Sequence, residues 1–412
     1  MLKINFANLL LLKPRFVFTN SIRKAGSRQI KNFINFHPHL KVAHRIPAIY
    51  KKIAARDSID YLYLVCPEIA RNIANHVLAS VNLDKKQVIA EANAGLGLVS
   101  TELLERGVNR VRIYEKCDKC LSILQNFNIT YPERVEIICE SFFDLNILDL
   151  KDRHENQGRV HIFFKDIPKR AWTDDPVLTV VGTLTTVEFF KHLIRCFFFQ
   201  STPVSFGRIQ IFAILKPKHY KILSANKGDG KFYRNLSVMF NLLFDHELLE
   251  TFNRDMFLPW EKFGRYKHSM QDFDVGKMYL VKINFKKDFP VPAEHFIGLY
   301  HFIQQLYGRG NKCVIPLMEK FVPGSGFNAI VPSMNHKHFP KEVNIFTKFN
   351  ELTPEEISTL FKETIMHPNY KSSPLMAMIE ASFLKTELYD PYSVDDMEEN
   401  IINEKMEMEE KF

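Results

Sequence analysis

Acidic residues are absent from the first 56 positions of this 412-residue chain, which carry twelve Lys and Arg residues before the first acid, Asp57. A basic, acid-free stretch interleaved with apolar residues is typical of a mitochondrial transit peptide, and we expect one at residues 1–45. A basic arm that binds nucleic acid is the alternative. A secretory signal does not fit, because Lys13, Pro14 and Arg15 interrupt the apolar run early. The leader therefore predicts the mitochondrial matrix.

Long apolar runs and cysteines are also scarce. No run reaches the roughly 18 apolar residues of a membrane-spanning helix. The longest candidate, residues 187–199, contains an acid, two basic residues and a histidine, and we expect a mostly buried helix there. Six cysteines in a chain of this length fit a reducing compartment. Cys117 and Cys120 form one CxxC without the two further ligands that zinc requires, so no metal is expected.

The formal net charge of +8 is unevenly distributed along the chain. Residues 57–386 are close to neutral for their size, whereas residues 387–412 carry ten acids and two lysines and predict an acidic, solvated tail. Any contact with nucleic acid must then come from local basic groups. Lys216 and Lys218, which follow an expected strand, are candidates, with ordinary solvated surface as the alternative.

Short apolar segments alternate with helical periodicity from about residue 60, which is typical of a mainly parallel sheet covered by helices. Residues 160–164 are ambiguous and are a candidate inserted strand. Gly107 occupies a position where a helix ends in the left-handed conformation. We expect strands at 87–91, 111–114, 135–139, 178–181, 208–215 and 278–284, and helices at 98–106, 117–127 and 187–199.

Two prolines, Pro290 and Pro292, and a change to helical periodicity mark a domain boundary near residue 290. We expect an α/β domain at 57–289, a small helical domain at 290–386 and the acidic tail at 387–412. An amphipathic helix is predicted at 293–307. Thr353, followed by a proline and two acids, is a strong helix start.

A glycine loop follows the first long strand. Glu91 ends this strand, Gly95 and Gly97 form the turn, and a helix follows, so backbone N–H groups can point at a ligand. Glu115 ends the next strand, where a carboxylate can accept hydrogen bonds from both ribose hydroxyls. A purely structural turn is the alternative. Without a third glycine or a phosphate-binding cation, the pattern favours S-adenosylmethionine over a dinucleotide.

Together these residues resemble the rRNA adenine dimethyltransferase family, whose members dimethylate adenines near the end of small-subunit rRNA. The resemblance runs from about Tyr61 to Phe263 and into the helical region. Leu64 matches the cofactor-edge segment, and the segments 233–238 and 257–260 match two later motifs. The resemblance implies a Rossmann-like S-adenosylmethionine methyltransferase sheet with helices on both faces and a small C-terminal helical domain. It places Leu64, Glu91, Gly95, Gly97, Glu115, Glu140 and Ser141 at the cofactor.

The departures from the family concern its chemistry. The adenine-side aspartate falls on Ser141, beside Glu140. The catalytic Asn-Leu-Pro-Tyr (or Phe) sequence falls on Thr183, Leu184, Thr185 and Thr186. In the enzymes, the amide orients the target amine and the ring stacks on the flipped base. Losing stacking costs about 1–3 kcal/mol and losing an orienting hydrogen bond about 3 kcal/mol, together roughly a thousandfold or more in rate. Phe189 or Phe190 is a candidate replacement for the ring.

Within the family, the leader, the altered fourth motif and the acidic tail resemble the mitochondrial transcription factor B branch, second paralogue. This resemblance implies a partnership with mitochondrial RNA polymerase in the nucleoid, promoter melting and binding of the non-template single strand. Arg309 resembles part of a glycine-arginine-arginine DNA contact, with Lys312 as a candidate for its second arginine. Two alternatives remain open. One is a working S-adenosylmethionine-dependent rRNA adenine dimethyltransferase, and the other is a ribosome-assembly protein that binds rRNA without modifying it.

Overall fold

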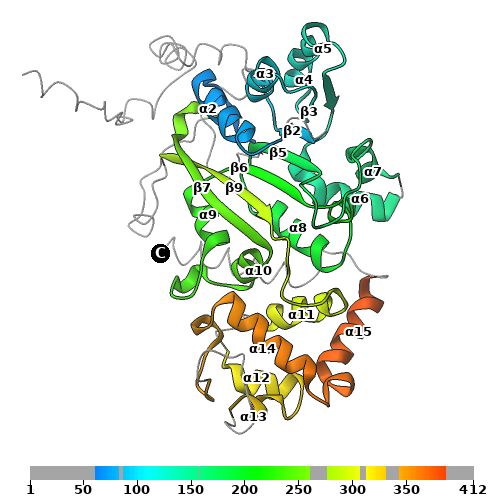
Figure 1. Ribbon diagram of the computed structural model, residues 1–412, viewed down its shortest axis with the longest axis vertical. Helices are drawn as coiled ribbons and strands as arrows, with labels where there is room; N and C mark the ends of the chain where they lie inside the picture. The colour runs from blue at the N-terminus through cyan, green and yellow to red at the C-terminus, as the bar shows by residue number, and fades with distance from the viewer. Residues whose placement is uncertain are drawn as a thin grey trace, which may run out of the picture.

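A computed structural model of the chain describes residues 61–82, 87–155, 157–259, 276–306, 312–330 and 343–386 (Figure 1). The expected transit peptide, the acidic tail and Arg309 lie outside the described residues. Within the described ranges, every helix is too short or too polar to traverse a lipid bilayer.

A seven-stranded sheet with the order β4-β3-β2-β5-β6-β9-β7 forms the centre of the α/β region. The five strands from β4 to β6 are parallel, and β9 runs antiparallel between β6 and β7. The six strands expected from the sequence are all present. The bounds are β2 Val88–Ala92, β3 Val111–Tyr114, β4 Val135–Ile138, β5 Leu178–Thr183, β6 Ile209–Leu215, β7 Phe244–Asn253 and β9 Lys277–Phe285.

The seventh strand, β7, was not predicted. It lies at the edge of the sheet with β9 as its neighbour, and most of its residues are exposed or half-buried. Asp245, Glu247 and Glu250 interrupt the apolar alternation that identifies a strand in sequence. An edge strand with so little burial leaves a weak pattern.

Helices cover both faces of this sheet. Neighbouring residues of one strand enter opposite hydrophobic clusters: Val180 packs with α6, α7, α8 and α10, whereas Val181 packs with α2 and α3. This alternation is the period of two expected for a sheet buried on both sides. The bounds are α2 Pro67–Leu78, α3 Leu98–Glu105, α4 Asp118–Leu124, α5 Asn126–Thr130, α6 Leu145–Glu155, α7 Arg159–Phe163, α8 Glu188–Phe198, α9 Pro217–Ser224 and α10 Asn235–Leu243.

Two local predictions need correction. Residues 160–164 form most of the short helix α7 and not an inserted strand. Val160 and Phe163, three residues apart, are buried, while the two residues between them are exposed, and five residues are too few to show this spacing in sequence. The helix expected at 117–127 is divided into α4 and α5. The prediction for Gly107 is confirmed, since its φ is +90° after the end of α3.

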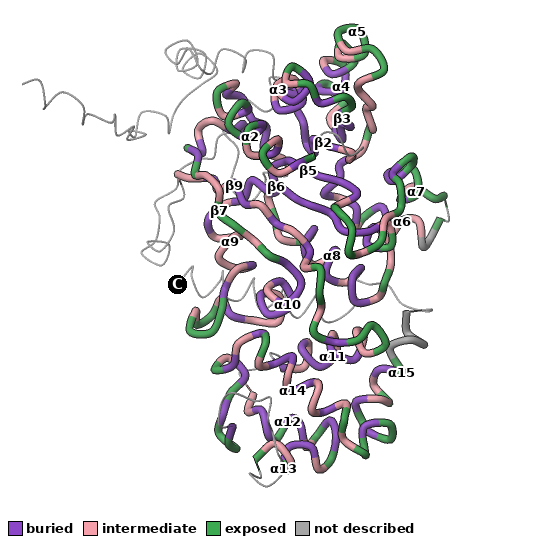
Figure 2. The backbone as a smooth tube through the Cα atoms, viewed as in Figure 1, coloured by how far each residue is buried: buried purple, intermediate pink, exposed green. Residues whose placement is uncertain are grey.

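After β9 the described residues form helices. A 3-10 turn at Ala293–His295 precedes α11, and a capping box at Thr353 begins α14, as the sequence predicted. Buried residues of these helices belong to the same hydrophobic cluster as those of α8 and α10. The boundary near residue 290 therefore does not interrupt the hydrophobic core (Figure 2). The bounds are α11 Phe296–Leu306, α12 Val314–Phe321, α13 Ser325–Ile330, α14 Pro354–Met366 and α15 Pro374–Thr386.

A separate two-stranded sheet holds the start of the described chain. β1 (Tyr63–Leu64) pairs antiparallel with β8 (Phe257–Leu258), and the N–H of Val65 donates to the carbonyl of Met256 at 3.0 Å. The pairing of these distant segments brings the cofactor-edge segment of the sequence against the glycine loop.

Candidate functional site

The glycine loop joins β2 to α3 at the carboxyl edge of the parallel strands. Gly95 and Gly97 have φ values of +58° and +67°, which side chains with a Cβ adopt only with strain. A Cβ at Gly95 would lie 2.6 Å from Cδ1 of Tyr63, and one at Gly97 would lie 2.7 Å from Cζ of Phe127. Both glycines are therefore required by the backbone and by close aromatic neighbours.

Glu115, the expected ribose acid, is placed beside this loop but is only 1% exposed. One carboxylate oxygen accepts from the N–H of Gly95 at 2.7 Å. The other accepts from the N–H of Cys117 at 2.8 Å and from the hydroxyl of Tyr63 at 3.4 Å. Burial raises the pKa of Glu115, and the donated hydrogen bonds counteract part of that effect.

Glu91 is oriented into the fold beneath the loop. It is 4% exposed, and its Oε2 accepts from the N–H of Ser100 in the first turn of α3 at 2.7 Å. Burial raises the pKa of Glu91 to about 7. The carboxylate thus fixes the start of α3, which is how this position supports the loop.

Asn93 connects Ser141, at the end of the third expected strand, with Thr183 of the fourth motif, although sequence reasoning did not select it. Its side chain donates to the carbonyl of Thr183 at 3.2 Å and accepts from the hydroxyl of Ser141 at 3.0 Å. Its φ of +54° is rare for a residue other than glycine, and asparagine tolerates it best. An asparagine two residues before Gly95 was the available signal. Glu140, next to Ser141, is half-exposed.

At the fourth motif, the Thr183 hydroxyl donates to the backbone carbonyl of Leu62. Leu184 is buried and Thr186 is exposed. The suggestion that Phe189 or Phe190 supplies a stacking ring is wrong in this arrangement. Both are at most 1% exposed and pack in the core of the sheet domain.

Thr185 of the fourth motif and Leu64 of the cofactor-edge segment complete the set of expected positions. Thr185 is half-exposed, and Leu64 is 7% exposed and paired with Phe257 in the small sheet. Of the positions expected at the cofactor, Gly95 and Glu115 are in direct contact, and Tyr63, the neighbour of Leu64, contacts both. Thr183 of the fourth motif is joined to this group through Leu62. The arrangement fits an adenosyl ribose poorly, because three hydrogen bonds leave about one of the roughly four lone-pair sites of the Glu115 carboxylate, and a ribose brings two hydroxyls.

The basic candidates lie in two places. Lys216 precedes α9 directly after β6, and Lys218 lies in its first turn; both are half-buried. The N–H of Leu184 donates to the carbonyl of Ile214 at 3.0 Å, so these lysines follow the strand end that neighbours the fourth motif. Lys312 lies in the helical region, where its Nζ donates to the carbonyl of Gln305 at 3.0 Å.

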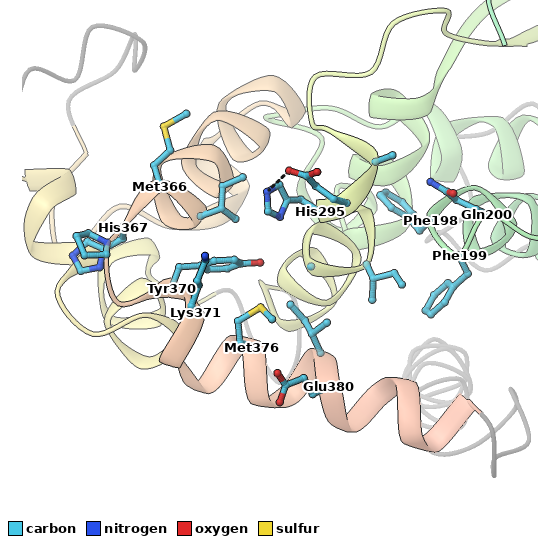
Figure 3. Close-up of a pocket in the computed structure, with 17 residues that line it drawn as sticks. Phe198, Phe199, Gln200, His295, Met366, His367, Tyr370, Lys371, Met376 and Glu380 are labelled. Carbon is cyan, nitrogen blue, oxygen red and sulfur yellow. Dashed lines mark ion pairs between the residues drawn. The ribbon is translucent and has the colours of Figure 1, made fainter. Parts of the chain in front are cut away.

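A large cavity of about 1120 Å³ lies away from the glycine loop, between the end of α8 and helices α11, α14 and α15 (Figure 3). Its walls carry apolar side chains and an ion pair between Glu294 and His295 at 3.4 Å. None of the expected cofactor residues lines it. Among the residues that the structure describes, no group of three or more His, Cys, Asp or Glu side chains could hold a metal ion.

Comparison with known proteins identifies a matching family and two relatives. The family model for ribosomal RNA adenine dimethylase matches residues 68–264. Dimethyladenosine transferase 2, mitochondrial, of Drosophila melanogaster is 28% identical, covering 79% of this chain and 80% of the relative. The Homo sapiens protein of the same name is 23% identical, covering 76% and 79%.

Two methyltransferase structures illustrate a distant likeness to solved structures. An rRNA methylase from Streptococcus thermophilus gives a TM-score of 0.26 at 11% identity, covering 53% of this chain and 94% of that one. Magnesium protoporphyrin IX methyltransferase from Synechocystis gives 0.27 at 11% identity, covering 53% and 79%. The family match spans the glycine loop, Glu115 and the fourth motif. Over residues 68–264 the chain therefore matches the ribosomal RNA adenine dimethylase family, and over most of its length it is similar to the mitochondrial dimethyladenosine transferase 2 proteins.

Proposed function

We propose that this protein is a mitochondrial transcription initiation factor that uses a methyltransferase fold to bind nucleic acid and does not depend on methyl transfer. It acts with mitochondrial RNA polymerase in the nucleoid, where it helps to melt the promoter and holds the non-template single strand. The observation that carries the proposal is the fourth motif. Thr183 occupies the position of the catalytic amide, and its hydroxyl is bonded to the backbone of Leu62.

Threonine cannot replace asparagine in this chemistry. An amide side chain is longer and presents a carbonyl acceptor to the amine, whereas the Thr183 hydroxyl is donating to Leu62. The nearest phenylalanines in sequence are buried, so neither stacks on a base in this arrangement. Catalysis depends on groups held where the transition state needs them, and both of these groups are missing from the motif.

Basic residues at the same edge of the sheet support a nucleic-acid role. The segment 216–234 begins after β6, includes α9 and ends at the start of α10; it contains six Lys and Arg residues and one acid, Asp229. Lys221 is paired with that acid. Such a segment attracts phosphates through charge without reading base sequence.

The deciding experiment is run-off transcription with mitochondrial RNA polymerase, with and without this protein, on a mitochondrial promoter. One template is a closed duplex and the other carries a pre-melted bubble at the start site. A melting factor is required on the duplex and nearly dispensable on the bubble. Equal stimulation on both templates, or none on either, contradicts the proposal.

The contribution of the basic segment is tested by salt dependence. Lys216→Gln with Lys218→Gln is expected to reduce the slope of log affinity for single-stranded DNA against log salt by about 1 to 2, since each phosphate contact contributes about 1. Lys287→Gln with Lys371→Gln is the control, because both lysines are exposed and lie away from the carboxyl edge of the parallel strands. Equal slopes for the two double variants contradict a role for the segment.

The second candidate function is methylation of small-subunit rRNA by S-adenosylmethionine. It is favoured by the retained Gly95, Gly97 and Glu115 and by the family match. Methyl transfer to an rRNA hairpin that is abolished by Gly95→Asp and by Glu115→Ala would establish it in place of the first.

A further inference from the structure

The side chain of Tyr63 lies between the two parts of the cofactor motif. It lies beside Gly95, where an added Cβ would meet the Cδ1, Cγ and Cβ atoms of the tyrosine between 2.6 and 3.3 Å. Its hydroxyl reaches the Glu115 carboxylate at 3.4 Å, and the residue is 1% exposed. A ribose bound in the manner of this fold must reach the same carboxylate from beside the same glycine.

Three contacts hold Tyr63 in this position. The neighbouring carbonyl of Leu62 accepts the hydrogen bond of Thr183, the pairing of Tyr63 with Leu258 joins β1 to β8, and Val65 bonds Met256. The first contact is made by the residue at the catalytic amide position. The altered fourth motif and the tyrosine are thus parts of one connected arrangement.

We propose that Tyr63 fills the ribose end of the cofactor site and that Thr183 acts as a positioning residue that keeps it there. In this position Tyr63 excludes adenosyl nucleosides, including S-adenosylmethionine, from the site. This inference rests on the proposed function, in which methyl transfer is not needed. It adds that the side chain of Tyr63 closes the site, so substitution of Tyr63 should restore cofactor binding.

The test is calorimetric titration of the full chain with S-adenosylmethionine, and with adenosine as a probe of the ribose end alone. Tyr63→Ala is expected to bind both at least tenfold more tightly than the wild type, because it vacates the ring volume and one acceptor position. Tyr63→Phe retains the ring and frees the acceptor alone, so it gives a smaller gain. Thr183→Val, which releases Leu62, is also expected to tighten binding several-fold.

Tyr61→Phe is the matched control. Tyr61 belongs to the same segment and also donates its hydroxyl to a carboxylate, but to that of Asp144, at 2.8 Å. Its affinity should equal that of the wild type. Thermal melting identifies the variants that remain folded. The inference is overturned if folded Tyr63→Phe and Thr183→Val bind no more tightly than the wild type. It is also overturned if the wild type already binds S-adenosylmethionine with micromolar affinity.

Run-off transcription separates this inference from the proposed function. If the variants gain cofactor affinity but the wild type fails to stimulate transcription on the duplex promoter, the proposed function is wrong and the closure by Tyr63 stands. If transcription depends on the protein and the affinities do not change, the closure is wrong and the proposed function stands.

Discussion

The buried carboxylate of Glu91 allows the clearest quantitative prediction. Glu91 is 4% exposed, bonds the N–H of Ser100 and has a pKa raised by burial from 4.5 to about 7. The folded state therefore holds a proton at this position more tightly than the unfolded state. The stabilising effect of that proton is fully present below about pH 4.5 and is lost as the pH rises through about 7.

The magnitude follows from the difference between the two pKa values. One pKa unit corresponds to about 1.4 kcal/mol, so keeping the charged carboxylate inside the fold costs about 3 kcal/mol of unfolding free energy above pH 7. Glu91→Gln removes the ionisation and retains an oxygen that can accept from Ser100. As the pH is raised from 5 to 8, the unfolding free energy of the variant should increase by about 2–3 kcal/mol relative to that of the wild type.

Urea unfolding of wild type and variant at the two pH values measures this difference. The comparison between pH values is decisive, because packing changes caused by the amide are the same at both. Glu105→Gln is the control, since Glu105 is exposed at the end of α3, the helix whose start Glu91 bonds, and such surface substitutions change stability by less than about 0.5 kcal/mol. A stability difference for Glu91→Gln that does not vary with pH would refute the argument that burial controls this carboxylate.

Three further predictions concern the framework of the site. Gly182→Ala should lower the unfolding free energy by about 3 kcal/mol or more in denaturant titrations, because its Cβ would lie 2.3 Å from the carbonyl oxygen of Ala92; a loss below 1 kcal/mol contradicts the close packing of β5 on β2. Thr353→Ala should cost about 1 kcal/mol by removing the cap of α14, and an unchanged melting temperature would argue against that cap. Tyr233→Phe leaves the buried carbonyl of Leu352 without its 2.7 Å donor, so it should cost about 1–3 kcal/mol and increase protease cleavage after residue 290; equal cleavage rates would contradict this link between the two regions.

The site has a consequence for attempts to restore methyl transfer. Replacing Thr183 by asparagine would return the amide and loosen the segment at Leu62, but the side chain of Tyr63 would still be present beside Gly95 and Glu115. If methyl transfer is lost and Tyr63 closes the cofactor site, as proposed above, both changes have to be reversed together. A single substitution in the fourth motif is not expected to produce an active enzyme.

Local sequence determined much of the framework. The parallel strands are short, mostly apolar segments, and the loop at Gly95 and Gly97 is specified by residues that tolerate positive φ. Thr353 and its neighbours specify the start of α14 through contacts within four residues. The ribose acid Glu115 could be selected because its distance along the chain from the glycine loop is set by one helix and one strand. In each of these cases the decisive interactions are close in sequence, so the pattern is visible without the fold.

The tertiary structure determined which groups contact one another at the cofactor motif. The contact of Tyr63 with Glu115 joins residues 52 positions apart, and the bond from Thr183 to Leu62 spans 121 positions. The burial of Phe189 and Phe190, and the exposure of β7, likewise depend on which elements pack against them. A sequence states which groups are present, but a carboxylate's remaining acceptor capacity depends on donors supplied by distant segments. For that reason the sequence identified the cofactor motif, and only the folded chain showed that the Glu115 carboxylate already accepts three hydrogen bonds.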